Sequence, residues 1–147
     1  MKLYILTAAM LIATYAPAQN KGAEIFQKNG AAINGYDAVA FFTESKPVKG
    51  SADHSIEWKN AKWLFVSQAN ADSFRADPEK YAPQYGGYCA YGCADGHKAP
   101  TEIDTWTVMD GKLYFNFNQK VKTFWDKDRP KYIRQANMNW EKIRFTE

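Results

Sequence analysis

The chain has 147 residues, which is long enough for one domain with an adequate hydrophobic core. Its formal net charge of +3 is too weak and too dispersed to indicate a nucleic-acid-binding protein, and two cysteines are too few for a disulfide-dense scaffold. Aromatic residues make up 16% of the chain, so we expect a core or a groove built from Trp, Tyr and Phe.

The N-terminus has the features of a secretory signal peptide. The basic residue Lys2 precedes a mostly apolar, uncharged run over residues 3–15. Ala16-Pro17-Ala18 then provides the small residues that a signal peptidase recognises at its cleavage site. The apolar run is too short and interrupted to favour a stable membrane span, although an uncleaved anchor is the alternative. We therefore predict a signal peptide over residues 1–18, one mature domain over residues 19–147, and a periplasmic or extracellular location without stable membrane insertion.

The first half of the mature domain shows short helical and strand signals. Residues 21–27 form a weak helical start, and the turn signal Asn34-Gly35 precedes an apolar run over residues 39–42. Two short strands are predicted over residues 55–58 and 63–66. Ser67 is a typical N-cap for a helix that continues to about residue 76, where Asp77-Pro78 starts a second short helical turn.

The second half begins with an irregular stretch over residues 85–101 and continues into a predicted hairpin over residues 105–117. Asp110-Gly111 suits its type I′ turn, which pairs Val108 with Leu113 and Trp106 with Phe115 on one face. Helical periodicity follows over residues 121–125 and again after Asp128, with Pro130 in the first turn of the last helix. The predicted fold is α+β: a small antiparallel sheet with a C-terminal Asp-Gly hairpin, packed by short helices and a C-terminal helix.

Chemistry-bearing residues gather in the irregular stretch. Cys89, Cys93 and His97 recur at four-residue intervals, and the two cysteines are the only ones in the chain. Two thiolates and an imidazole suit Cu(I) or Zn(II). Gly92 and Gly96 disfavour a regular helix there, although a glycine-rich loop could still surround a metal. The same thiols could instead form a disulfide, as is common in exported proteins, or remain free and buried.

Several blocks of sequence carry a family resemblance: residues 34–42, 53–55, 74–81, 84–91 and 106–114. Together they resemble the YHS-domain family in its exported single-domain form. The family is similar to TRASH-type metal-binding domains and often accompanies copper-transporting pumps or heavy-metal proteins. The resemblance implies a small module that handles a soft metal.

The chain departs from the metal-type pattern at three positions. That pattern places one cysteine at the position of Ala40 and two in the run Phe65–Asn70, at Val66 and Asn70. Because none of the three residues is a thiol, the family's metal site cannot be carried over to them. His54 matches the histidine in the family name, although a hydrogen-bonded structural histidine is the simpler interpretation.

The candidate metal ligands are therefore Cys89, which is favoured, with Cys93, His97 and His54. Asp95 and Asp53 could orient an imidazole, although solvated loop acids are the simpler interpretation. Tyr85, Tyr88 and Tyr91 could form an aromatic pocket for a small ligand or a shield around a metal, and ordinary packing is the alternative.

No catalytic motif is apparent, so an enzyme is not expected. The sequence favours an exported YHS-type binding module that handles copper, as Cu(I), or zinc. The alternative is a structural or small-ligand-binding module with a Cys89–Cys93 disulfide or a thiol-redox role. Its partner would be a metal ion or a small ligand, and the oligomeric state is not determined.

Overall fold

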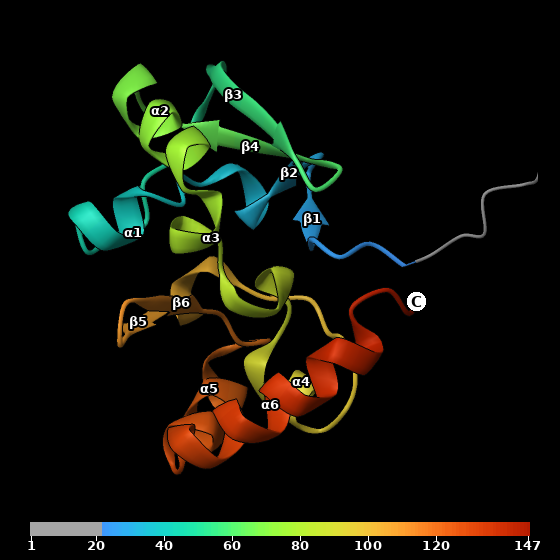
Figure 1. The fold of residues 1–147 in the computed structure, drawn as a ribbon. Coiled ribbons are helices and arrows are strands. Elements are labelled where there is room, and N and C mark those ends of the chain that lie inside the picture. The colour runs from blue at the N-terminus through green and yellow to red at the C-terminus, as the bar shows by residue number, and fades with distance from the viewer. Residues whose placement is uncertain (1–21) are drawn as a thin grey trace, which may run out of the picture.

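The computed structural model describes residues 22–147 as two halves, which lie one above the other in Figure 1. The signal peptide predicted over residues 1–18 lies outside the described residues. The N-terminal half consists of β1 (Gln27–Lys28), β2 (Ala31–Ala32), α1 (Ala40–Thr43), β3 (Ser51–Trp58), β4 (Ala61–Phe65), α2 (Gln68–Ala76) and α3 (Pro78–Tyr81). The C-terminal half consists of α4 (Ala90–Ala94), β5 (Thr107–Met109), β6 (Lys112–Tyr114), α5 (Gln119–Asp126) and α6 (Arg129–Ile143). Within residues 22–147, no helix is long and apolar enough to cross a membrane.

The strands form three separate antiparallel pairs, β1–β2, β3–β4 and β5–β6, rather than one small sheet. The α+β class is thus confirmed, with three two-stranded sheets among short helices and a C-terminal helix. In the last pair, Val108 lies opposite Leu113, but the paired residues run only from Thr107 to Tyr114. The hairpin predicted over residues 105–117 is therefore shorter in the structure, and Trp106, which follows a 3₁₀ turn over Ile103–Thr105, is not paired with Phe115. The turn residues Asp110 and Gly111 have φ values of 53° and 71°, which a type I′ turn requires.

Helix boundaries follow their capping residues closely. Ser67 caps α2, accepting the N–H of Asn70 at 3.1 Å, and Asp77 ends that helix while capping α3. Asn118 caps α5 and Asp128 caps α6 through the same type of side-chain contact. Each cap satisfies a backbone donor that the helix itself leaves unpaired, which explains why the predicted helix starts agree with the structure.

The helix predicted over residues 21–27 is wrong where the structure describes it. Residues 22–26 are irregular, and Gln27 enters β1, which pairs with β2 across Asn29-Gly30. Both turn residues have positive φ, 54° and 75°, so this Asn-Gly pair is a hairpin signal that outweighs the weak helical pattern. The apolar run over residues 39–42 lies largely within α1.

Strand β6 lies between two hydrophobic clusters. Leu113 and Phe115 pack into the cluster of the N-terminal half, which also contains Trp63 and Phe74. Tyr114 points the other way and packs against Trp125 in the cluster of the C-terminal half. Because side chains alternate along a strand, this one short segment contributes to both cores.

A single buried side chain joins α1 to the β4–α2 connection. One carboxyl oxygen of Asp37 accepts the N–H groups of Val39 at 2.8 Å and Ala40 at 3.2 Å. The other accepts the N–H of Val66 at 2.9 Å and the side-chain amide of Asn70 at 2.8 Å. Asp37 has no exposed surface, so these four donors replace the water that its carboxyl group would otherwise bind.

We predict that Asp37→Asn lowers the free energy of unfolding by about 3 kcal/mol, measured by urea denaturation. An amide has only one oxygen, so its NH₂ group would face either Val39 and Ala40 or Val66 and Asn70, all of which are donors. Asp53→Asn is the matched control, because Asp53 is exposed on β3, and should change stability by less than about 0.5 kcal/mol. Equal unfolding midpoints for the two variants would contradict this account.

Candidate functional site

Cys89 follows a left-handed stretch of backbone at the start of the C-terminal half. Tyr85, Gly86 and Gly87 have φ values of 57°, 62° and 86°. A Cβ on Gly86 would collide with the carbonyl group of Glu24, so only glycine allows the N-terminal segment to pass this closely. After this turn, the chain reaches Cys89, which is the N-cap residue of α4.

The backbone at Cys89 is held by hydrogen bonds on both sides. Its N–H donates to the carbonyl oxygen of Ala99 at 3.0 Å. The N–H of the next residue, Ala90, donates to the carbonyl oxygen of Phe115 at 2.9 Å, which makes a parallel bridge between Cys89 and Phe115. These bonds fix the direction of the Cys89 side chain.

The Cys89 sulfur accepts hydrogen bonds from two backbone N–H groups. The N–H of Gly92 lies 3.4 Å from Sγ and that of Phe117 lies 3.2 Å from it, while the thiol donates to the side-chain oxygen of Asn116 at 3.6 Å. Burial raises the pKa of the Cys89 thiol, and the backbone donors around the sulfur oppose this effect in part. The resting side chain is therefore a neutral thiol in a polar setting.

Cys89 also lines a pocket of about 360 Å³, which we call the Cys89 pocket. Its lining residues are Cys89, Tyr91, Gly92, Asp95, His97, Ala99, Phe117 and Val121. Cys89 is only 1% exposed and so belongs to the inner wall, whereas Phe117 is 44% exposed and belongs to the outer edge. Most of the wall is apolar, and its ionisable groups are the Cys89 thiol, His97, Asp95 and the Tyr91 phenol.

His97 faces the same pocket from the loop after α4. The ring nitrogen Nδ1 of His97 lies 3.6 Å from a carboxyl oxygen of Asp95. The backbone N–H of His97 donates to the carbonyl oxygen of Gly92 at 3.0 Å. A Cβ placed on Gly92 would lie 3.4 Å from His97 Nε2 and 3.5 Å from Cys89 Cβ. The same Cβ would lie 3.3 Å from the backbone carbonyl oxygen of His97, so the His97 loop approaches α4 closely at this glycine.

Cys93 has different surroundings from Cys89. It is fully buried in the C-terminal core, in the same cluster as Trp125 and Ala136, and it does not line the Cys89 pocket. Burial, with a smaller contribution from Cys89, raises the pKa of the Cys93 thiol to about 12. Both cysteines are free thiols in the structure, so the disulfide alternative is not what the structure contains.

His54 lies in the other half of the protein. It belongs to β3, and its Nδ1 lies 3.4 Å from the side-chain oxygen of Gln68. Strand β3 belongs to the N-terminal half and α4 to the C-terminal half (Figure 1), and His54 does not line the Cys89 pocket. Of the four predicted metal ligands, only Cys89 and His97 share a pocket.

The predicted tyrosine pocket is also divided. Only Tyr91 lines the Cys89 pocket. The hydroxyl of Tyr85 donates to the side-chain oxygen of Asn137 at 2.9 Å, and that of Tyr88 donates to the carbonyl oxygen of Ala23 at 2.9 Å. The sequence-based prediction missed Ala99, Phe117 and Val121, because the loop after α4 and the segment after β6 reach the pocket only through folding.

A match to known proteins covers part of the chain. Residues 39–85 match the YHS domain. Neither the curated proteins nor the solved structures include a match to the chain. The YHS resemblance is thus confirmed from α1 to the turn at Tyr85, whereas Cys89 and His97 lie beyond the matched segment.

The structure brings together Ala40, Val66 and Asn70, the three positions compared with the metal-type pattern in the sequence analysis. Backbone N–H groups of Ala40 and Val66 and the side-chain amide of Asn70 all donate to Asp37. A hydrogen-bond network thus connects these positions in this chain. In the part of the chain that the structure describes, no group of three or more His, Cys, Asp or Glu side chains could hold a metal ion. The described residues of this chain therefore do not fit a metal centre with three or four such ligands.

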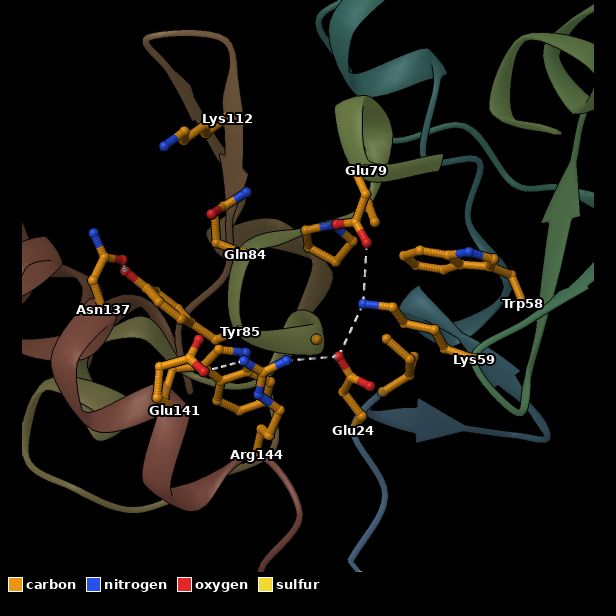
Figure 2. A pocket seen from close by; sticks show the side chains of 15 residues that line it. Glu24, Trp58, Lys59, Glu79, Gln84, Tyr85, Lys112, Asn137, Glu141 and Arg144 are labelled. Atoms are coloured by element: carbon orange, nitrogen blue, oxygen red, sulfur yellow. Dashed lines mark hydrogen bonds and ion pairs between the residues drawn. The ribbon is translucent and has the colours of Figure 1, made fainter. Parts of the chain in front are cut away.

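A second cavity, of about 400 Å³, lies between the two halves and is lined by charged groups (Figure 2). Lys59 Nζ lies 2.9 Å from Glu24 and 3.2 Å from Glu79, and Arg144 pairs with Glu141 and lies 3.9 Å from Glu24. Burial lowers the pKa of Lys59, but the two carboxylates outweigh it and raise the pKa overall. These pairs connect α6 to the N-terminal half. Their residues are so scattered along the chain that no local pattern predicts them.

Serine and alanine substitutions should change the free energy of unfolding in opposite order at the two cysteine positions. Cys89→Ala removes an acceptor from two N–H groups and should cost about 1–2 kcal/mol of stability, whereas Cys89→Ser keeps an acceptor and should cost less. At position 93 the order should reverse, because serine would place a hydroxyl in an apolar core at a cost of about 1–3 kcal/mol. Urea denaturation of the four variants measures this, and the same order at both positions would contradict the assigned roles.

Proposed function

We propose that this chain is an exported YHS-type binding module that takes a small, mostly apolar ligand with a polar end in the Cys89 pocket. The observation that carries the proposal is the pocket itself, in which apolar side chains form most of the wall and Cys89, Asp95 and His97 supply a few polar groups. Small-molecule sites typically combine these two features.

The size of the pocket supports a small ligand. Its volume of about 360 Å³ lies near the lower end of the range for small-molecule sites. The wall residues come from α4 with its N-cap Cys89, from the loop after α4, and from the segment after β6 that continues into α5, so the pocket depends on the packing of three segments. Export is the part of the proposal that rests on the sequence alone, through the signal peptide predicted over residues 1–18.

Cyclohexanone is a suitable probe, because it is small and apolar with one hydrogen-bond acceptor. We expect it to shift the amide resonances of Gly92, Phe117 and Val121 in a two-dimensional NMR titration. Val121→Phe fills the pocket and should abolish these shifts, while Val66→Phe, at an exposed position in the N-terminal half, should leave them unchanged. Shifts spread over the whole surface, or equal shifts in Val121→Phe, would contradict a defined pocket.

Copper binding is the second candidate, because Cys89 and His97 line the same pocket and sulfur with imidazole suits Cu(I). Bound copper would be held by these two side chains, without Cys93 or His54.

Copper content after anaerobic loading with Cu(I), followed by desalting, tests this candidate. Cys93→Ser should retain the copper of the wild type, while Cys89→Ser should lose most of it. Equal copper in the wild type and Cys89→Ser would reject copper binding at this site.

A further inference from the structure

Aromatic side chains at the Cys89 pocket continue outward into an exposed surface. Phe117, Val121 and Tyr91 line the pocket together. The centre of the Tyr91 ring lies 6.1 Å from that of Phe124 and 5.0 Å from that of Tyr132. Phe117 and Phe124 are exposed, while the other three side chains are partly buried. We call these five residues the α5 aromatic surface.

The packing of α5 turns this surface outward. Trp125 is fully buried in the C-terminal core, whereas Phe124, directly before it, is 37% exposed. Successive side chains of a helix differ by about 100° in direction, so burying Trp125 points Phe124 away from the core. Helix α5 lies at the lower end of Figure 1, away from the N-terminal half. Contiguous exposed apolar side chains of this kind are typical of an interaction site.

Lysine side chains surround the α5 aromatic surface. Lys127 Nζ lies 5.3 Å from the centre of the Phe124 ring, and Lys131 Nζ lies 5.5 Å from the centre of the Tyr132 ring. Lys120 is exposed one helical turn before Phe124, on the same side of α5. Among residues 22–147, none of these three lysines takes part in an ion pair.

The positive charge of the chain is concentrated in this region. Residues 117–134 contain six Lys and Arg residues and two Asp residues, whereas the whole chain has a net charge of +3. Asp126 is paired with two of these basic residues, and Asp128 caps α6. Asp95, at the edge of the surface, lies 3.6 Å from His97. An anionic partner would therefore meet unpaired lysines and few free carboxylates.

We propose that the α5 aromatic surface binds the headgroup region of bilayers that contain anionic phospholipids. Phenyl and phenol rings enter the boundary between headgroups and acyl chains, where aromatic side chains are favoured. The lysines bury their alkyl stems beside the rings and direct their ammonium groups to the lipid phosphates. Binding is peripheral, through side chains alone. The proposal goes beyond ligand binding in the Cys89 pocket and does not depend on it.

A second copy of the chain fits this surface less well than a bilayer does. A two-fold contact would place the same surface of both copies face to face. Lys120, Lys127 and Lys131 of each copy would then meet like charges, which is unfavourable. An anionic bilayer instead presents a layer of negative charge above an apolar interior, and this order matches aromatic side chains surrounded by lysines.

The test measures how the predicted mature chain, residues 19–147, partitions onto sucrose-loaded vesicles in a sedimentation assay. The predicted signal peptide is omitted, because its apolar run would itself bind lipid. We expect partition onto an equimolar mixture of phosphatidylcholine and phosphatidylglycerol to exceed partition onto phosphatidylcholine alone by at least about tenfold. High salt should release the chain, since it screens the attraction between lysine and phosphate.

Charge reversal tests the lysines. Lys120→Glu combined with Lys131→Glu should weaken partition onto the anionic vesicles by at least about tenfold. Both positions lie in the first turn of a helix, where glutamate is favourable, so the fold should be retained. Lys46→Glu combined with Lys49→Glu is the matched control. These residues are exposed in the N-terminal half, and the same change in net charge there should alter partition by less than about twofold.

A second pair of variants tests the aromatic side chains. Phe117→Ser combined with Phe124→Ser should also weaken partition by at least about tenfold, because apolar area no longer enters the bilayer. Val66→Ser combined with Phe145→Ser removes two similarly exposed apolar side chains outside the α5 aromatic surface and should have little effect. Unfolding midpoints of all four double variants show whether each retains the fold.

Three results would overturn the proposal: no sedimentation with anionic vesicles, equal partition onto neutral vesicles, or losses in the control variants as large as in the test variants. Dimers that Phe117→Ser with Phe124→Ser disrupts, without any vesicle binding, would identify the surface as an interface between two copies, and the lipid proposal would be wrong. Because cyclohexanone binding is measured without lipid, either proposal can fail while the other stands.

Discussion

The carboxyl group of Asp37 is the contact on which the N-terminal half depends. It accepts four hydrogen bonds, two from the start of α1 and two from the connection between β4 and α2. Because the group is fully buried, each of these bonds also satisfies a donor that has little access to water. The same two segments contain Ala40, Val66 and Asn70, so in this chain the carboxyl group of Asp37 connects the three positions that were compared with the metal-type pattern.

The second organising feature is β6, whose alternating side chains enter both hydrophobic clusters. The chain directly after it supplies the carbonyl oxygen of Phe115 to Ala90 and the N–H of Phe117 to the Cys89 sulfur. The Cys89 pocket is therefore built on a strand that both cores hold in place. Ion pairs around the polar cavity connect the two halves at another point, through Lys59, Glu24 and Arg144 (Figure 2).

Burial separates the two cysteines into different chemical roles. Both are inaccessible to bulk solvent, yet Cys89 is surrounded by backbone donors and an adjoining pocket, whereas Cys93 is surrounded by aromatic and aliphatic side chains. This difference in surroundings arises because Cys89 is the non-helical N-cap of α4 whereas Cys93 lies inside the helix, and the four-residue spacing in the sequence does not reveal it.

The sequence by itself determined the α+β class, the YHS resemblance, the strands at β3 and β4, and the helix starts at Ser67, Asp77 and Asp128. These features depend on neighbouring residues, since a cap, a turn and strand alternation act within a few positions. Only the tertiary structure decided that His97 joins Cys89 while Cys93 and His54 do not, and that Phe117 and Val121 complete the pocket. These groupings arise from long-range packing against β6 and α6, because the free energy of burying a core selects which distant segments meet.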